Sequence, residues 1–333
     1  MTPLIELKGV SKRFVKPLDM AARIGNLFGA GMQEEVVHAV DRVDLAIAPG
    51  EVVGLVGESG CGKSTLGRIA VGLHAPTEGT RLWRGAPLTD RDSAAGRATQ
   101  IKIQMIFQDP YASLNPRMRV EQIVGEAPVV HGLVAAAQRE AYVAELLAKV
   151  GLDGAMARRF PHQFSGGQRA RIGIARALAV KPEFIVCDEA VAALDVSIQA
   201  QVLNLFMALR SEFNLTYLFI SHDLGVVRHL SDRVVIMYLG RVVESAPTTA
   251  VYEEPNHPYT RALLSEVPSL KRRKREYAPV VGEIPSPLAP PPGCHFHPRC
   301  PHAGPRCRRE APQLREIAPA RLSACHLNDG GTA

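Results

Sequence analysis

The sequence predicts an α/β fold built around a parallel sheet, and three apolar runs carry that prediction. The runs at 52–56, 184–187 and 215–220 lack the alternation of apolar and polar residues that half-exposed strands show. Strands of this kind are covered on both faces, as in a parallel sheet with helices on each side. Each run ends abruptly in polar residues, so we expect the carboxyl ends of the three strands to form one site.

Alternating segments and a helical region surround these runs. Residues 4–10 and 43–47 alternate apolar and polar side chains, which predicts half-exposed strands of a separate antiparallel sheet. Apolar residues at helical spacing, ending at Gly151, predict a helix, and we expect a helical subdomain over about 110–180.

The composition of the chain changes after about residue 265. A basic run at 271–276 and a proline-rich stretch at 283–293 precede a cysteine-rich tail, which is typical of a linker and an accessory module. We therefore expect a main domain over 1–265 and a linker with a C-terminal extension over 266–333.

Bulk composition favours a globular protein of the cytosol. With 46% hydrophobic residues, a chain of 333 residues can bury a substantial core. No run approaches the ~18 apolar residues of a membrane span, and the first ten residues lack the layout of a secretory signal. The net charge of +6 comes from scattered basic residues, which is typical of a solvated surface and gives little support to nucleic-acid binding.

A phosphate-binding loop follows the first buried run. Residues 57–64, GESGCGKS, match G-x-x-x-x-G-K-S/T between a strand and a helix, the context that this motif requires. We expect backbone N–H groups to cradle phosphates, Lys63 to reach the β and γ phosphates, and Ser64 to bind Mg²⁺. The residues expected to bind nucleotide here are Gly57, Glu58, Ser59, Gly60, Cys61, Gly62, Lys63, Ser64 and Thr65.

The other two buried runs end in residues that suit phosphate chemistry. Asp188 is placed to complete the Mg²⁺ shell through water, and Glu189 to point at the attacking water. His222 follows the third run and can hydrogen-bond a γ-phosphate, although a lone histidine is usually structural.

The segment FSGGQ begins a predicted helix with two glycines, Gly166 and Gly167. Each glycine inside a helix costs about 1 kcal/mol relative to alanine. Ser165 and Gln168 have the spacing of a capping box, which explains neither glycine. Glycines at a helix N-terminus let an anion approach free N–H groups at the positive end of the helix dipole, so the pattern predicts an anion site.

In order along the chain, these motifs resemble the ATP-binding subunit of ABC transporters over 1–265. The matching positions are Gly57–Thr65, Gln108, Ser165–Gln168, Asp188–Glu189, Asp195 and His222. The resemblance implies a P-loop NTPase fold with a RecA-like parallel sheet core, an antiparallel β subdomain, an α-helical subdomain and a small cysteine-containing C-terminal extension. It also implies that two subunits pack head to tail, so that the Ser165–Gln168 segment of each meets the γ-phosphate held by the other.

The resemblance implies further roles by position. Phe14 is similar to the aromatic residue that stacks on adenine, although by itself it would pass for a core residue. Gln108 is similar to the residue that touches Mg²⁺ or water and reports nucleotide occupancy to the membrane partner, and Asp195 to the acid that crosses the dimer interface. The expected catalytic residues are Glu189 as general base, His222, Lys63 and Gln108, and the expected Mg²⁺ ligands are Ser64, Gln108 and Asp188.

Two residues depart from the family pattern. Ala190 and Ala193 stand where the family usually has proline and serine. Neither position supplies phosphate or metal chemistry, so we expect an altered rate or interface stiffness rather than loss of activity.

Four segments resemble the oligopeptide/dipeptide importer branch, particularly the second of its two ATPase subunits. They are 108–118, the insertion at 15–37, 257–264 and 282–326. The resemblance implies an ATPase that closes as a dimer on ATP and drives two membrane permease subunits fed by an external binding protein. It places the chain peripherally on the cytoplasmic face of the inner membrane. Its dimer partner is a sister ATPase subunit or a second copy of itself.

The cargo stays open at this point. Peptides are the expected cargo, but the branch also serves nickel, glutathione and some sugars. A soluble ABC-type ATPase acting on nucleic acid usually has two ATPase halves or a long coiled coil, whereas this chain has one phosphate loop and no heptad run, so no nucleic-acid partner is expected. A regulatory subunit without hydrolysis would need a damaged Glu189 or Ser165–Gln168 segment, and both are intact.

The tail contains four of the six cysteines, Cys294, Cys300, Cys307 and Cys325. Four thiolates in a cytosolic segment can hold a 4Fe-4S cluster or zinc. Some importers of this branch carry an iron–sulfur cluster in this region, whereas the lack of C-x-x-C pairs makes zinc less natural. The remaining alternative is that the cysteines bind no metal and pack as small apolar residues. The histidines that can substitute as ligands are His295, His297, His302 and His326.

The run Lys271–Arg275 is expected to be a solvated linker, with contact to acidic lipid headgroups as the alternative.

Overall fold

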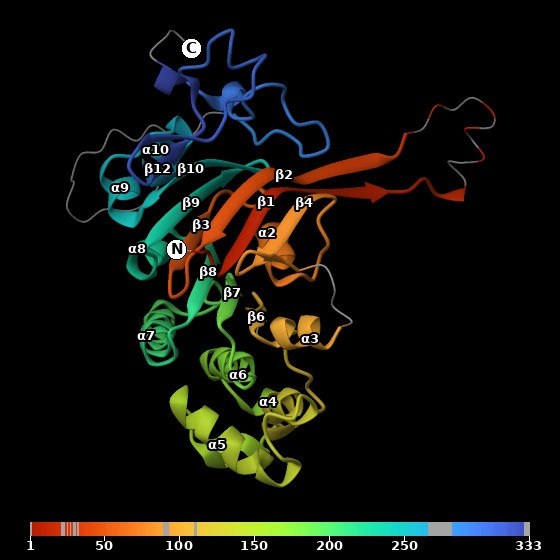
Figure 1. The fold of residues 1–333 in the computed structure, drawn as a ribbon, viewed down its shortest axis with the longest axis vertical. Coiled ribbons are helices and arrows are strands. Elements are labelled where there is room, and N and C mark those ends of the chain that lie inside the picture. The colour runs from red at the N-terminus through yellow and green to blue at the C-terminus, as the bar shows by residue number, and fades with distance from the viewer. Residues whose placement is uncertain are drawn as a thin grey trace.

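The computed structural model describes residues 2–20, 33–88, 93–109, 112–265 and 282–329, together with residues 24, 26, 28 and 31. Two β-sheets and a group of helices make up the described chain (Figure 1). The predicted α/β class, with a parallel core sheet and a separate antiparallel sheet, is confirmed. The basic run at 271–276 lies outside the described residues.

The smaller sheet is antiparallel and has the order β2-β1-β4-β5. Its strands are β1 (Ile5–Lys16), β2 (Glu35–Ile47), β4 (Glu78–Trp83) and β5 (Ala86–Pro87). Both strands expected here are longer than their alternating segments. The reason is that β1 and β2 continue to pair, as far as Lys16 and Glu35, beyond the part of β1 that pairs with β4. In Figure 1 this continuation extends as an arm away from the body of the protein.

The larger sheet has the order β11-β12-β10-β9-β3-β8-β7-β6. Its strands are β3 (Val52–Val56), β6 (Ile103–Ile106), β7 (Phe184–Asp188), β8 (Thr216–Ser221), β9 (Arg233–Tyr238), β10 (Arg241–Pro247), β11 (Arg315–Ala318) and β12 (Arg321–Ser323). The five strands from β9 to β6 pair in parallel, and the three buried runs of the sequence are β3, β7 and β8 at its centre. All three are buried along their whole length, which is why they show no alternation.

The helices follow the strands of the core sheet or form a layer below it in Figure 1. The α-helices are α2 (Lys63–Val71), α3 (Ala94–Ile101), α4 (Val120–Val130), α5 (Arg139–Lys149), α6 (Gly166–Leu178), α7 (Val196–Phe213), α8 (Leu224–Leu230), α9 (Thr248–Glu253) and α10 (Pro258–Ser265). The short 3₁₀ helices are η1 (Ala136–Gln138), η2 (Gly154–Arg158), η3 (Pro161–Gln163), η4 (His297–Arg299) and η5 (His326–Asp329).

The C-terminal extension is built into the core sheet. Strand β12 pairs with β10 through Glu244↔Ser323 and Ser245↔Leu322. The backbone N–H of His38 on β2 donates to the carbonyl of Pro287 (3.0 Å), so the proline-rich stretch packs against the smaller sheet. The domain boundary at residue 265 stays a prediction, and one sheet contains strands from both sides of it.

Three buried apolar clusters hold the layers together. One lies between the core sheet and helices α4 to α7, and a second joins the smaller sheet to α2 and the other side of the core strands. The third surrounds β9, β10, α8 and α10 and takes in Phe296 from the extension. The core strands are therefore covered from both sides, and only their ends are open to a ligand.

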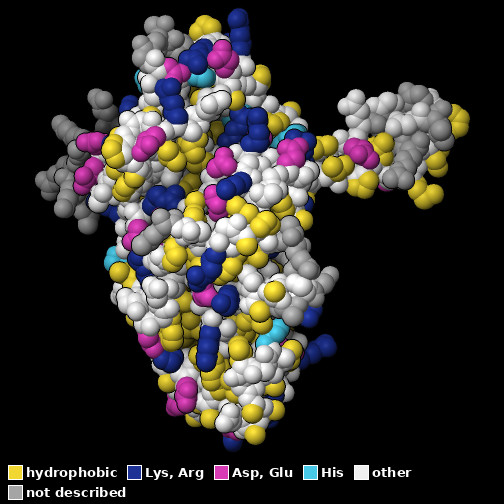
Figure 2. All heavy atoms as spheres, in the orientation of Figure 1, with side chains coloured by type: hydrophobic (Ala, Val, Ile, Leu, Met, Phe, Trp, Pro, Cys, Tyr) yellow, Lys and Arg dark blue, Asp and Glu magenta, His cyan; other side chains and the backbone are white. Residues whose placement is uncertain are grey.

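The surface in Figure 2 has Lys and Arg side chains interspersed with Asp and Glu, with no single basic face on the side shown. Within the described ranges, no helix is both long and apolar enough to cross a bilayer.

Candidate nucleotide-binding site

The loop 57–62 joins β3 to α2, and its backbone shape depends on glycine. Gly62 has φ 103°, a left-handed conformation that side chains rarely adopt. A Cβ on Gly62 would lie 2.1 Å from the carbonyl oxygen of Ala39, and one on Gly57 would lie 2.1 Å from the carbonyl oxygen of Met237. The loop is therefore wedged between β2 and the end of β9, and a side chain at either glycine would displace it.

Lys63 lies inside this loop. Its Nζ donates to the carbonyl oxygens of Gly57 (2.8 Å) and Glu58 (2.9 Å), and the residue is only 5% exposed. The ammonium group is thus held where phosphate oxygens would take over as hydrogen-bond acceptors. This geometry suits the phosphate contact expected of Lys63.

Ser64 and Asp188 meet although 124 residues separate them in the sequence. Ser64 Oγ donates to Asp188 Oδ1 at 2.7 Å. Burial raises the pKa of Asp188, while the hydrogen bond from Ser64 and the charge of Arg68 act in the opposite direction. A hydroxyl and a carboxylate oxygen at this separation form the kind of hard oxygen pair that Mg²⁺ binds.

Glu189 is surrounded by side chains from two neighbouring strand ends. Gln108 Nε2, just beyond β6, donates to Glu189 Oε2 at 2.7 Å. His222 Nδ1, just beyond β8, lies 3.2 Å from Glu189 Oε1. Glu189 has φ 47°, a left-handed backbone conformation that few non-glycine residues adopt. The structure therefore brings Gln108, Glu189 and His222 together at one edge of the sheet.

Ser165 begins α6 with a complete capping box. Its Oγ accepts from the Gln168 N–H (3.3 Å), and Gln168 Oε1 accepts from the Ser165 N–H (3.0 Å). The two glycines that follow differ in their surroundings. A Cβ on Gly167 would come 2.4 Å from Ile198 Cγ2 on α7, whereas one on Gly166 would meet only Leu194 Cδ2 at 3.8 Å. Gly167 therefore has a packing role within the chain that the sequence did not predict, and Gly166 has none.

The Ser165–Gln168 segment and the phosphate loop belong to different parts of one chain. No hydrogen bond or ion pair connects the two segments, both of which the structure describes. In Figure 1, α6 lies in the helical layer and α2 lies beside the smaller sheet. Within one chain, the start of α6 is therefore not bonded to the phosphate loop.

Phe14 and Asp195 are both exposed. Phe14 on β1 is 38% exposed, contacts His74 edge-on (ring centroids 5.5 Å apart) and lies 5.2 Å from Lys12 Nζ. It is not a core residue, which removes the alternative role considered for it. Asp195 is the N-cap residue of α7, and its carboxylate makes no capping hydrogen bond to the helix.

Of the two departures from the family pattern, Ala190 is buried and Ala193 is exposed.

Two family models match the chain. The model described as ABC transporter matches residues 40–192, and the model described as oligopeptide/dipeptide transporter, C-terminal region, matches residues 243–307. The oligopeptide transport ATP-binding protein AppF of Bacillus subtilis is 53% identical to this chain, covering 87% of it and 90% of the relative. The dipeptide transport ATP-binding protein DppF of Escherichia coli is 48% identical, covering 80% of each. The chain belongs to the ATP-binding subunits of ABC transporters, in the oligopeptide/dipeptide branch.

A solved structure agrees with this membership. The post-hydrolysis dimer of the ATP-binding cassette MJ0796, bound to ADP and Pi, superposes with a TM-score of 0.61. It is 30% identical and covers 73% of this chain and 98% of its own. The ABC ATPase fold and the ATPase activity predicted for this subunit are thereby confirmed.

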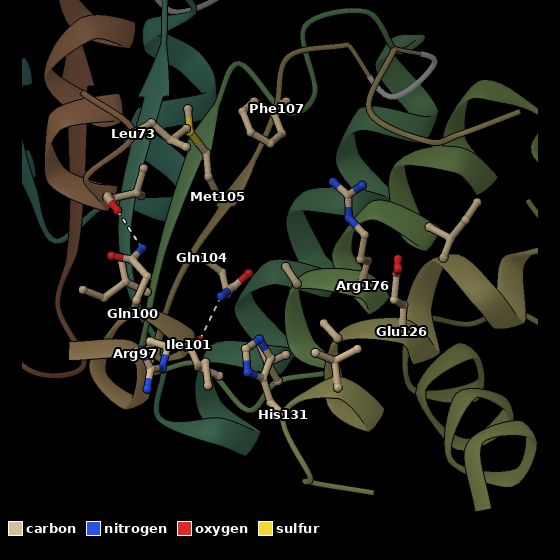
Figure 3. Close-up of a pocket in the computed structure, with 17 residues that line it drawn as sticks. Leu73, Arg97, Gln100, Ile101, Gln104, Met105, Phe107, Glu126, His131 and Arg176 are labelled. Carbon is tan, nitrogen blue, oxygen red and sulfur yellow. Dashed lines mark hydrogen bonds between the residues drawn. The ribbon is translucent and has the colours of Figure 1, made fainter. Parts of the chain in front are cut away.

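An apolar groove of about 660 Å³ lies beside Gln108 in this ABC ATPase subunit. Figure 3 shows its lining residues from β6, α3, α4 and α6. Three of them are large exposed apolar side chains, Leu73 (55%), Phe107 (38%) and Val130 (73%). Phe107 directly precedes Gln108, so the groove and the site around Glu189 share one backbone segment.

The phosphate loop also contacts the C-terminal extension, and the sequence analysis did not predict this contact. Arg299 Nη1 and Nη2 donate to the two carboxylate oxygens of Glu58 at 2.7 and 2.9 Å. The backbone N–H of Glu58 donates to the hydroxyl oxygen of Tyr259 at 2.9 Å. Arg299 lies 241 residues from Glu58, so no local pattern could have paired them.

The four tail cysteines are free thiols that lie near one another. The Cys294 N–H donates to the carbonyl oxygen of Cys307 at 2.8 Å. Burial raises the pKa of Cys294 to about 11, and the other three tail thiols add to that shift. Across the described ranges, however, no group of three His, Cys, Asp or Glu side chains has the arrangement of a metal site. The thiols have the donor chemistry of a cluster or zinc site, but the structure does not place them as ligands.

Three of the candidate histidine ligands have other partners. His295 Nδ1 lies 2.9 Å from the carbonyl oxygen of Leu239, and burial lowers the pKa of His295 to about 4. His297 Nδ1 lies 2.9 Å from the carbonyl oxygen of Cys294. His326 Nε2 lies 3.0 Å from the carbonyl oxygen of Glu310. These contacts hold the imidazoles against the backbone rather than toward a metal.

We expect Gly167→Ala to destabilise this subunit by about 1–3 kcal/mol, because the added methyl group overlaps Ile198 on α7. Urea denaturation of the full-length chain measures the change. Gly166→Ala is the matched control, since the same methyl group meets only Leu194 Cδ2 there, at an ordinary contact distance of 3.8 Å, and alanine favours the helix. Ile198→Ala combined with Gly167→Ala should cost less than the two single changes together. Equal stabilities for the two alanine variants would contradict the packing role of Gly167.

Proposed function

We propose that this ABC ATPase subunit powers the import of di- or oligopeptides through a membrane permease. The names of its relatives, which are oligopeptide and dipeptide transport ATP-binding proteins, support that cargo. The observation that carries the proposal is the position of Gln108. The Gln108 side chain donates a hydrogen bond to the candidate base Glu189, and the preceding residue, Phe107, lines an exposed apolar groove. One segment thus connects hydrolysis to a surface that a partner can occupy.

In the proposed reaction, ATP binds with its phosphates in the loop 57–64. Lys63 Nζ exchanges its carbonyl acceptors for phosphate oxygens, and the loop N–H groups donate to the same oxygens. Ser64 and Asp188, with Gln108 nearby, would hold Mg²⁺, which supplies charge neutralisation for the transferred phosphate. Phe14 is exposed on β1 and is proposed to stack on the adenine ring.

Glu189 is proposed to orient the attacking water and accept its proton. Gln108 and His222 hold the two oxygens of the Glu189 carboxylate, which directs that group toward one position. His222 is 59% exposed and can turn its other ring nitrogen toward the γ-phosphate. The carboxylate would then act on the attacking water, and the imidazole on the γ-phosphate that this water attacks.

The second half of the site is proposed to come from another ATPase chain. The N–H groups at the start of α6 are the donors that suit the γ-phosphate, and Gly166 leaves them uncovered. Asp195 is exposed at the N-cap of α7, the next residue, Val196, is 82% exposed, and both are proposed to contact the partner. The partner is a sister subunit or a second copy, and closure of the two chains on ATP would be the power stroke.

The permease is proposed to contact the groove beside Phe107. Its exposed apolar side chains suit a short apolar segment of a membrane partner, and solvent-exposed apolar patches of this kind mark interaction sites. This contact would hold the subunit on the cytoplasmic face of the inner membrane. Two permease subunits and an external binding protein complete the proposed importer.

The cargo is tested on the complex copurified with its permease from membranes. ATPase activity is measured while the external binding protein is supplied with peptides, nickel, glutathione or sugars in turn. We expect di- or oligopeptides to stimulate turnover and the other ligands to leave it unchanged. Stimulation by one of the others would reassign the cargo. Salt-sensitive nucleic-acid binding with no membrane association would contradict the importer altogether.

Glu189→Gln should lower ATP turnover by about 10² to 10⁴-fold, because the amide cannot accept the proton of water. ATP affinity should stay within about threefold, since Glu189 makes no contact with the phosphate loop. Phosphate release and nucleotide binding by the purified complex measure the two effects. Glu140→Gln, at an exposed ion pair with Arg158, is the control that should leave both unchanged. Turnover near the unmodified rate in Glu189→Gln would remove Glu189 from the reaction.

We propose that the four tail cysteines hold a 4Fe-4S cluster, with zinc as the alternative metal. The observation in favour is that Cys294 and Cys307 lie side by side, joined by a 2.8 Å backbone hydrogen bond, in a tail that also contains the free thiols of Cys300 and Cys325. Ligation would require the thiols to move into a tetrahedral arrangement, because the described geometry is not that of a metal site.

Anaerobic absorption spectra of the full-length chain test this proposal. We expect a broad visible band, together with bound iron and sulfide, that Cys300→Ser removes. The band should survive Cys187→Ala, which removes a buried thiol of the core sheet. Zinc without iron would identify the alternative metal, and neither metal in a chain prepared anaerobically would refute both assignments.

A further inference from the structure

Arg299 forms a buried two-point ion pair with the phosphate loop. Both terminal nitrogens of its guanidinium donate to the carboxylate of Glu58, at 2.7 and 2.9 Å. The side chain of Arg299 is 5% exposed and that of Glu58 is 22% exposed. A paired geometry of this kind fixes direction as well as distance, because the planar fork matches the carboxylate. The carboxylate therefore holds the second residue of the loop in one orientation.

An aromatic cluster holds the Arg299 turn in place. Phe296 in the extension lies with its ring centroid 5.2 Å from that of Tyr238 and 5.3 Å from that of Tyr259. Tyr259 also accepts the backbone N–H of Glu58 through its hydroxyl oxygen. The extension and the loop thus share the same rigid support, and the Arg299 guanidinium reaches the loop from it.

The extension contacts the other end of the loop through the β9–β10 turn. The Gly240 N–H donates to the carbonyl oxygen of Cys61 at 2.9 Å. His295 Nδ1 lies 2.9 Å from the carbonyl oxygen of Leu239, and Arg241 Nη1 donates to the carbonyl oxygen of Gly293 at 3.1 Å. Residues of the extension therefore support the loop at Glu58 directly and at Cys61 through one intervening turn.

Arg299 has no role of its own at the phosphates. Both of its terminal nitrogens donate to Glu58, Nη1 also donates to the Tyr238 hydroxyl oxygen at 3.4 Å, and the guanidinium is closed to solvent. Any effect of Arg299 on ATP binding therefore acts through the backbone of the phosphate loop. The N–H groups of that loop bind the phosphates best when they already point toward the phosphate site. A loop held in that shape loses less freedom on binding, which raises affinity rather than the rate of the chemical step.

We propose that Arg299 is a positioning residue that, through Glu58, holds the phosphate loop in its ATP-accepting shape. The C-terminal extension of this subunit thereby sets its affinity for ATP. The proposal rests on ATP binding at the loop 57–64, as in the proposed function, and does not depend on the cargo or on a metal in the tail.

The test is steady-state ATP hydrolysis by the full-length subunit in its permease complex. For Arg299→Met we expect the KM for ATP to rise by about tenfold with kcat within about twofold. Arg299→Lys keeps the charge but loses the two-point geometry and should give an intermediate rise of about threefold. Arg306→Met removes a tail arginine with exposed partners, Glu310 and Asp329, and should leave the KM unchanged.

A double-variant cycle separates positioning from stability. If the effect of Arg299 on ATP passes through Glu58, as proposed, Arg299→Met with Glu58→Gln should raise the KM no further than the larger of the two single changes. Thermal unfolding of each variant is measured beside the kinetics. A lower Tm with an unchanged KM in Arg299→Met, or additive KM effects in the double variant, would overturn the proposal.

Two results remain informative if another part of the account fails. If Arg299→Met does not fold, Arg299→Lys and Glu58→Gln still decide, since an unchanged KM in both would refute the positioning role. If the complex hydrolyses ATP but ignores peptide, the peptide cargo is wrong while the KM comparison stands.

Discussion

The parallel pairing of β3, β8 and β7 is the constraint on which the rest of the structure depends. The register sets Val56 opposite Ser221 and Asp188 opposite Ile220, so the three strands end at one edge of the sheet. The phosphate loop, the acidic pair and His222 follow those ends directly. The backbone hydrogen bonds between the core strands fix where each strand ends, and the residues that follow therefore lie close together. The hydrogen bond from Ser64 to Asp188 is one result.

The same arrangement leaves the site incomplete in one chain. Lys63 donates to the carbonyl oxygens of its own loop, and no hydrogen bond joins that loop to the start of α6, both of which lie in the described ranges. The two neighbouring glycines have different roles. Gly167 lets α6 pack on Ile198, and Gly166 leaves the N–H groups at the helix start without a side chain over them. A second ATPase chain would supply what is missing, and the groove beside Phe107 would transmit its closure to the permease.

Local patterns were enough to predict the core strands, the phosphate loop, the capping box at Ser165 and the helix that ends before Gly151. These features depend on residues close together in the sequence, where periodicity and motif spacing act. Contacts across long separations escaped prediction, as Arg299 with Glu58 and β12 beside β10 demonstrate. The packing role of Gly167 was also missed, because it depends on where α7 lies and not on the residues next to the glycine.

The central claim is that one nucleotide is held by two ATPase chains. A structure of the complete complex, trapped with Mg²⁺, ADP and vanadate, measures this most directly. The account predicts that the Ser165 hydroxyl and the N–H groups at the start of α6 from one chain lie about 3 Å from vanadate oxygens bound in the phosphate loop of another. Vanadate contacted by the residues of a single chain would contradict it.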